Sequence, residues 1–171
     1  HVCRLMGKWY GDGISLSPMT VNISRGSLYN PGLADMFIGL TVKYGIPISL
    51  LNLEITESAY ISEPELMRTA VQRLRRAGFV TMMDDFGSGY SSLNMLKDID
   101  VDALKLDMQF LANGSLTKKG EIILASVIQM ADRLGMPVIA EGVETEEQKK
   151  ILHRTGCKYV QGFYYEHPIP Q

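Results

Sequence analysis

Carboxylate, amide and ammonium side chains lie at or near the ends of six short apolar runs in this chain of 171 residues. Oxygen ligands of these types favour hard ions such as Mg²⁺ or Mn²⁺. Several carboxylates at one place repel each other unless a cation lies among them. Two such ions would clamp a phosphodiester and activate a water, while a lysine would neutralise charge on the phosphate. The pattern predicts metal-dependent phosphodiester cleavage by a set of seven residues, which are Asn22, Glu54, Asp84, Asp85, Lys105, Glu141 and Gln161.

The elements that must hold these residues follow from the apolar runs. Each run is short and bounded by Gly, Pro, Asp or Ser, which is typical of buried parallel strands. Helical patterns separate the runs, including one in which Ser62 is an expected cap with Pro64 just inside the helix, and one that opens with Thr145 as a capping start. Strands are expected at 19–23, 50–55, 79–83, 103–106, 137–140 and 159–162, and helices at 1–10, 28–44, 62–76, 121–134 and 145–156.

Strand alternation sorts the side chains between two faces. Leu51, Leu53 and Ile55 share one face, so Glu54 lies on the other. In the same way Lys105 lies opposite the leucines on either side of it. If the leucines pack beneath helices, Glu54 and Lys105 point into the mouth at the carboxyl ends of the strands, where barrel enzymes build their sites.

Alternating strands and helices indicate an α/β fold with a parallel sheet. Six strands fit either an open sheet or most of an eight-stranded TIM-type barrel. Such a barrel usually needs about 250 residues. We therefore expect a single domain over 1–171 that is incomplete at its N-terminus, with about six of eight βα units present.

Composition narrows the classes of function. The chain is 46% apolar with a net charge of −2, which disfavours a nucleic-acid coat and predicts no DNA partner. Cys3 and Cys157 are far apart and have no metal-type spacing, as expected of free thiols in a reducing compartment. No run reaches the ~20 apolar residues of a membrane span, and no signal peptide opens the chain. A cytoplasmic location is expected, on its own or as the cytoplasmic part of a membrane protein.

The polar residues at the strand ends also allow other interpretations. A single polar residue at a strand end is often a turn or cap residue, and Glu57, Asp107 and Glu144 fit that description. Lys105 could alternatively be the Schiff-base nucleophile of a barrel aldolase. Recurrence on successive strands favours a shared site instead.

The motifs resemble those of the EAL-domain phosphodiesterases, bacterial enzymes that linearise cyclic di-GMP to pGpG. The matching segments span nearly the whole chain in order: Val-Asn-Ile-Ser, Leu-Glu-Ile-Thr-Glu-Ser, Asp-Asp-Phe-Gly-Ser-Gly-Tyr-Ser-Ser, Leu-Lys-Leu-Asp, Ala-Glu-Gly-Val-Glu-Thr and Gln-Gly-Phe. The resemblance implies a TIM-type barrel, two Mg²⁺ or Mn²⁺ ions, a homodimer, and fusion to GGDEF, PAS or membrane modules in the parent protein.

The resemblance also implies a role for each residue. Asn22, Glu54 and Asp84 would bind the first metal, and Asp85 would bind the second with Asp84 bridging. Lys105 would contact the catalytic water, and Glu141 would be a metal ligand or the general base. Gln161 and Glu144 would support the site. Glu57 and the loop 86–92, which contains Ser88, would order the metal site and couple it to the dimer interface.

Departures from the family pattern define an alternative. The Glu-Ala-Leu motif, with its metal-binding Glu and phosphate-binding Arg, is absent. Ser88 replaces the usual Thr, Met108 replaces a common basic residue, and Glu166 and His167 precede Pro168 where Ser-Arg or Ser-Lys is usual. Lost positive charge would weaken nucleotide binding. The alternative is a catalytically inactive cyclic di-GMP receptor or interaction module.

Overall fold

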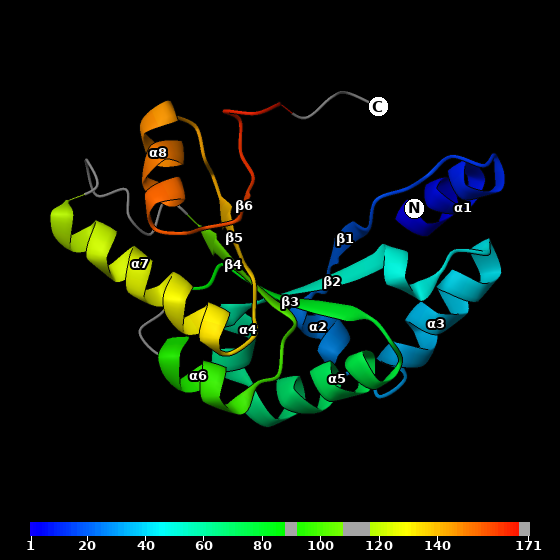
Figure 1. The fold of residues 1–171 in the computed structure, drawn as a ribbon. Coiled ribbons are helices and arrows are strands. Elements are labelled where there is room, and N and C mark those ends of the chain that lie inside the picture. The colour runs from blue at the N-terminus through cyan, green and yellow to red at the C-terminus, as the bar shows by residue number, and fades with distance from the viewer. Residues whose placement is uncertain (88–91, 108–116, 168–171) are drawn as a thin grey trace.

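The computed structural model describes residues 1–87, 92–107 and 117–167 (Figure 1). Its centre is a sheet of six parallel strands whose order in space equals their order in the chain. All six predicted strands are present. They are β1 (Met19–Asn22), β2 (Leu51–Thr56), β3 (Val80–Asp84), β4 (Ala103–Asp107), β5 (Val138–Glu141) and β6 (Tyr159–Val160).

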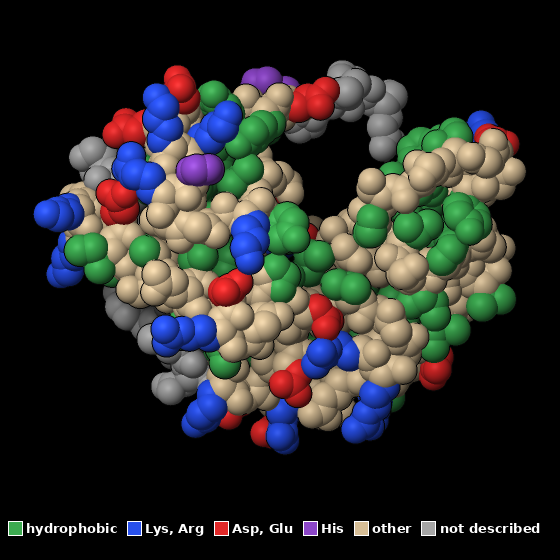
Figure 2. Space-filling model, in the orientation of Figure 1, with side chains coloured by type: hydrophobic (Ala, Val, Ile, Leu, Met, Phe, Trp, Pro, Cys, Tyr) green, Lys and Arg blue, Asp and Glu red, His purple; other side chains and the backbone are tan. Residues whose placement is uncertain are grey.

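Helices connect the strands and lie on the outer side of the sheet, which curls into a half-barrel (Figure 1). The space-filling view shows a hollow between the part of the chain around α1 and the part that follows β6 (Figure 2). The helices are α1 (Val2–Gly11), α2 (Arg25–Leu28), α3 (Leu33–Tyr44), the 3₁₀ turn η1 (Ile48–Leu50), α4 (Glu57–Ser62), α5 (Pro64–Arg76), α6 (Ser92–Asp98), α7 (Lys118–Arg133) and α8 (Glu146–Arg154).

Two helix predictions were wrong in detail. The helix expected at 28–44 begins only at Leu33, as α3, after Pro31 and Gly32, and Leu28 instead ends the short helix α2. Ser62 does not cap α5: it is the last residue of α4 and donates its hydroxyl to the carbonyl of Ser58. The capping start of α8 is confirmed, with Thr145 and Gln148 forming both hydrogen bonds of a capping box.

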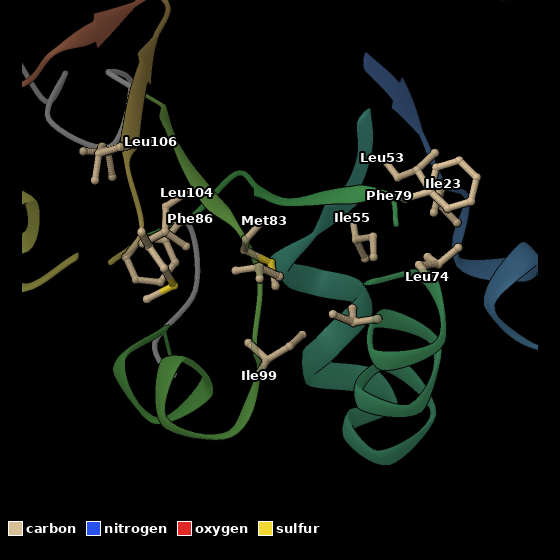
Figure 3. Close-up of a cluster of buried hydrophobic side chains, with 14 of the residues drawn as sticks. Ile23, Leu53, Ile55, Leu74, Phe79, Met83, Phe86, Ile99, Leu104 and Leu106 are labelled. Carbon is tan, nitrogen blue, oxygen red and sulfur yellow. The ribbon is translucent and has the colours of Figure 1, made fainter. Parts of the chain in front are cut away.

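The core lies between the outer face of the sheet and the helices (Figure 3). Leu51, Leu53 and Ile55 of β2 are 0% exposed, as the alternation predicted. Leu104 and Leu106 of β4 lie on the same outer side and are also buried. Because these side chains fill the space beneath the helices, their strand neighbours face the inside of the curled sheet.

Two further features concern the length of the helices and the state of the cysteines. None of the helices in the described ranges is long and apolar enough to cross a membrane. Cys3 is buried and Cys157 is half-buried, and both are free thiols, as expected.

Candidate active site

Four consecutive strands bring charged side chains to one end of the inner face. The register aligns Asp84 of β3 with Thr56 of β2, two residues beyond Glu54, and aligns Asp107 of β4 with Glu141 of β5. Parallel strands end at the same edge of a sheet, so residues 21 to 87 positions apart in the chain meet there. The structure thereby gathers Glu54, Asp84, Lys105 and Glu141.

The ammonium group of Lys105 is the centre of this cluster. Its Nζ lies 2.6 Å from Oε1 of Glu54, 2.9 Å from Oε1 of Glu141 and 3.3 Å from Oδ1 of Asp84. The Lys105 side chain is only 9% exposed. Lys105 donates hydrogen bonds to Glu54 and Glu141, and Asp84 lies within ion-pair distance of the same ammonium. Lys105 is therefore a structural counter-ion for the acidic cluster.

Charge and burial act against each other within the cluster. Burial alone lowers the pKa of Lys105, but its hydrogen bonds to Glu54 and Glu141 and the charge of Asp84 outweigh burial and raise that pKa above its ordinary value. Burial raises the pKa of Glu141, Lys105 opposes this, and Asp84 adds to the rise. Lys105 thus stays protonated at neutral pH. A Schiff-base lysine needs a lowered pKa, so the geometry argues against the aldolase interpretation.

Asp84 and Asp85 form a tight turn at the end of β3. Asp85 has a φ of 55°, a left-handed conformation that few residues other than glycine adopt, and its N–H donates to Oδ1 of Asp84 at 3.0 Å. Although Asp85 reaches solvent, partial burial of its carboxyl raises its pKa, and the charges of Asp84 and Asp107 add to the rise. Strained residues of this kind are concentrated at functional sites.

The segment after this turn is hydrogen-bonded to α4 and to β4. Glu57 is 0% exposed, and its Oε2 accepts a hydrogen bond from the N–H of Gly87 at 2.8 Å. The N–H of Phe86 donates to the carbonyl of Lys105 at 3.0 Å. Glu57 at the start of α4 thereby holds the chain that follows the two aspartates. Ser88, which was assigned to the same loop, lies outside the described residues.

Three other predicted residues lie at the rim rather than in the lysine cluster. Asn22 ends β1 in register with Glu54 and is exposed. Gln161 follows β6 and Glu144 follows β5, and both are exposed. The loops that carry them are joined, since the N–H of Val143 donates to the carbonyl of Gln161 and the N–H of Tyr164 donates to the carbonyl of Val143.

Asp107 is the residue that the sequence interpretation undervalued. It was treated as a cap or turn residue, yet it lies on the inner face two positions beyond Lys105, and its charge contributes to the raised pKa of Asp85. The signal was available, because alternation places Asp107 on the face of Lys105. A fifth carboxylate at this edge strengthens the acidic character of the site.

The donor chemistry fits a hard divalent cation, because carboxylate and amide oxygens are the side-chain acceptors at this edge. As the side chains stand, no group of three or more His, Cys, Asp or Glu within the described ranges is arranged to hold a metal ion. Lys105 supplies the positive charge among the carboxylates instead. The residues available for an ion are Asn22, Glu54, Asp84, Asp85 and Glu141.

A family model described as the EAL domain matches residues 1–168. Among curated proteins, the signaling protein YkoW of Bacillus subtilis is 35% identical over 99% of this chain and 21% of its own length. The bifunctional diguanylate cyclase/cyclic di-GMP phosphodiesterase MucR of Pseudomonas aeruginosa is 32% identical over 99% of this chain and 25% of its own. The cyclic di-GMP phosphodiesterase PA2567 of that species is 31% identical over 99% of this chain and 29% of its own length. The chain thus spans about a quarter of these relatives.

Solved structures agree in fold. The EAL domain of Mycobacterium smegmatis DcpA superposes with a TM-score of 0.86 at 35% identity, covering 98% of this chain and 75% of that one. The cyclic di-GMP complex of the MucR phosphodiesterase superposes with a TM-score of 0.87 at 32% sequence identity. The match covers 98% of this chain and 68% of that one. A manganese/cy-diGMP complex of Klebsiella pneumoniae BlrP1 superposes with a TM-score of 0.85 at 30% sequence identity. The match covers 95% of this chain and 41% of that one. These likenesses confirm the predicted TIM-type barrel architecture.

Proposed function

Because the chain belongs to the EAL domain family, we propose that it is a single phosphodiesterase domain that hydrolyses cyclic di-GMP to linear pGpG. The observation that carries the proposal is the convergence of Glu54, Asp84 and Glu141 on Lys105 at the carboxyl ends of the strands. It is supported by MucR and PA2567, whose names give cyclic di-GMP phosphodiesterase activity. The domain would act in bacterial second-messenger signalling.

Two Mg²⁺ or Mn²⁺ ions are the proposed cofactors. BlrP1 complexes that hold manganese or calcium with the dinucleotide support the use of divalent ions. Asn22, Glu54 and Asp84 would hold the first ion, and Asp85 the second. When bound, such ions supply a polarised phosphate and an activated water. Glu141 would add a further ligand or serve as general base.

The chain's own residues would supply position and charge. Lys105 is fully protonated and buried, so it would hold the attacking water or neutralise charge developing on the phosphate. Glu57 would keep the turn at Asp84 and Asp85 in place through Gly87. Gln161 and Glu144 would support the site from the rim. Homodimerisation, fusion to GGDEF or PAS domains, and a cytoplasmic location belong to the same proposal.

Hydrolysis by the complete encoded protein tests this function. Cyclic di-GMP would be incubated with Mn²⁺ or Mg²⁺, and pGpG would be quantified by anion-exchange chromatography. We expect turnover that EDTA abolishes and that Asp84→Asn reduces by at least ~100-fold. Asp132→Asn is the matched control, because Asp132 pairs only with the surface residue Lys158 at 3.3 Å in the described part of the chain and should leave turnover unchanged.

Two results would contradict the proposal. EDTA-resistant turnover would exclude metal dependence. Cyclic di-GMP binding without turnover in either metal would establish the receptor alternative, in which the same residues hold the nucleotide without cutting it.

A further inference from the structure

Asn52 occupies the inner face of β2, one layer below the acidic cluster. It precedes Glu54 by two residues and pairs in register with Thr20 of β1 and Val80 of β3. The residue is buried, at 9% exposure, yet its side-chain Oδ1 has no hydrogen-bond partner within the described residues. Buried polar atoms are almost always hydrogen-bonded, so this oxygen requires a donor.

The neighbours of Asn52 limit what that donor can be. The side chain of Val80 cannot donate, and Oε1 of Glu54 is an acceptor that already binds Lys105 at 2.6 Å. A hydroxyl such as that of Thr20 can donate to or accept from a water. An internal water needs two to four polar partners, and Asn52, Glu54 and Thr20 provide three on adjacent inner-face positions.

We propose that Asn52 is a positioning residue for Glu54. Its Oδ1 accepts a hydrogen bond from an internal water, whose second O–H is donated to the Glu54 carboxylate while Thr20 completes the water's partners. Glu54 is thereby held between this water below and Lys105 above. The inference rests on the proposed function, in which Glu54 is a metal ligand. Outer partners that orient ligating carboxylates typically change metal affinity by about 10–100-fold when removed.

Asn52→Leu is the direct test, because leucine has nearly the same shape and lacks the oxygen. Mn²⁺ binding to the complete encoded protein would be measured by isothermal titration calorimetry, without substrate. We expect the Kd for Mn²⁺ to rise by about 10–100-fold. The unfolding temperature without metal should not fall, because an apolar side chain of the same shape replaces the buried amide together with its water. In turnover assays kcat should fall while KM stays unchanged.

Three further variants separate positioning from packing. Asn52→Asp keeps an acceptor at the same place and should retain Mn²⁺ affinity. Val80→Ala removes volume from the same layer without removing a polar atom, so it should lower stability but not Mn²⁺ affinity. Thr20→Val removes the third partner of the water from an exposed position, and we expect a loss of affinity at the lower end of the same range.

The outcomes distinguish this inference from the function on which it rests. Equal Mn²⁺ affinity in Asn52→Leu and the parent protein would overturn the positioning role alone, and so would an equal loss in Val80→Ala. If Asn52→Leu does not fold, unchanged affinity in Thr20→Val overturns the role. A parent protein that binds no Mn²⁺ would overturn both this inference and the proposed metal-dependent function.

Discussion

Lys105 Nζ lies 2.6 Å from Oε1 of Glu54, and the two groups form a buried ion pair between β4 and β2 across the intervening strand β3. Glu141 and Asp84 complete the surroundings of the ammonium. The pair joins strands that are not hydrogen-bonded neighbours. The ion pair can form only because the sheet is curved enough to bring the inner faces of β2 and β4 together.

Replacement of Lys105 by Met should destabilise the protein and abolish its activity. Removing one partner of a buried ion pair typically costs about 3–5 kcal/mol in the free energy of unfolding. We expect that loss in thermal or urea unfolding without divalent metal, together with at least a ~100-fold loss of turnover. Added Mn²⁺ should restore part of the stability, because a cation again balances the carboxylates. A Lys105→Met protein as stable as its parent without metal would contradict the counter-ion role.

The crowded carboxylates should make metal-free stability depend on pH. The pKa values of Asp85 and Glu141 are raised in the folded state, by burial first and then by neighbouring acids. The folded state therefore binds protons more tightly than the unfolded state. As pH falls through these raised values towards about 4, the unfolding free energy contributed by the two groups should increase. Urea unfolding at a series of pH values measures this slope.

Asp85→Asn supplies the control for that slope. Because the asparagine cannot ionise, the variant should be more stable than the parent at neutral pH without metal, and its slope should be shallower. Mn²⁺ affinity of the parent should fall over the same pH range, since protonated carboxyls do not bind the ion. Stability of the parent that rises with pH across this range would contradict the assignment.

Glu57→Ala should loosen the turn that carries Asp84 and Asp85. The buried carboxylate accepts from the N–H of Gly87, and removing the acceptor of a buried donor costs about 1–3 kcal/mol. Reduced unfolding free energy and weaker Mn²⁺ binding are the expected results. Glu63→Ala is the matched control: Glu63 accepts from the Tyr29 hydroxyl in an exposed hydrogen bond, and its loss should change stability by no more than about 0.5 kcal/mol. Similar effects of the two changes would rule out a specific role for Glu57.

Gly162→Ala should separate the loops that follow β5 and β6. A Cβ at this position would lie 2.2 Å from the backbone oxygen of Val143, which no side chain can relieve. Forced overpacking of this kind costs about 1–3 kcal/mol. The hydrogen bonds that join Val143 to Gln161 and Tyr164 should be lost, with slower turnover through displacement of Gln161.

Gly39→Ala is the comparison for Gly162→Ala. Gly39 lies within α3 and has open space around its Cβ position. Alanine there should be neutral or should stabilise by up to ~1 kcal/mol, because it favours the helix. Equal thermal shifts in the two alanine variants would refute the close-approach argument.

The strands and the acidic edge could be predicted from sequence because both depend on local pattern. Short apolar runs between turn residues located all six strands, and alternation assigned Glu54 to the inner face and its flanking leucines to the core. The short helices α4 and α6 were not predicted, since 57–62 and 92–98 are too brief for a helical period to show. The helix expected at 28–44 was placed five residues too early, since α3 begins at Leu33 after Pro31 and Gly32.

Residue types and their order along the chain determined that an acidic set with one lysine would lie at the carboxyl ends of parallel strands. Tertiary structure alone decided which of them touch. Distances such as that between Lys105 and Glu141 depend on the curl and stagger of the sheet. The burial of Asn52, the nearness of Asp107 to Asp85 and the close approach of Gly162 to Val143 likewise emerge only when segments distant in the chain pack together, because burial and pairing are properties of the assembled sheet.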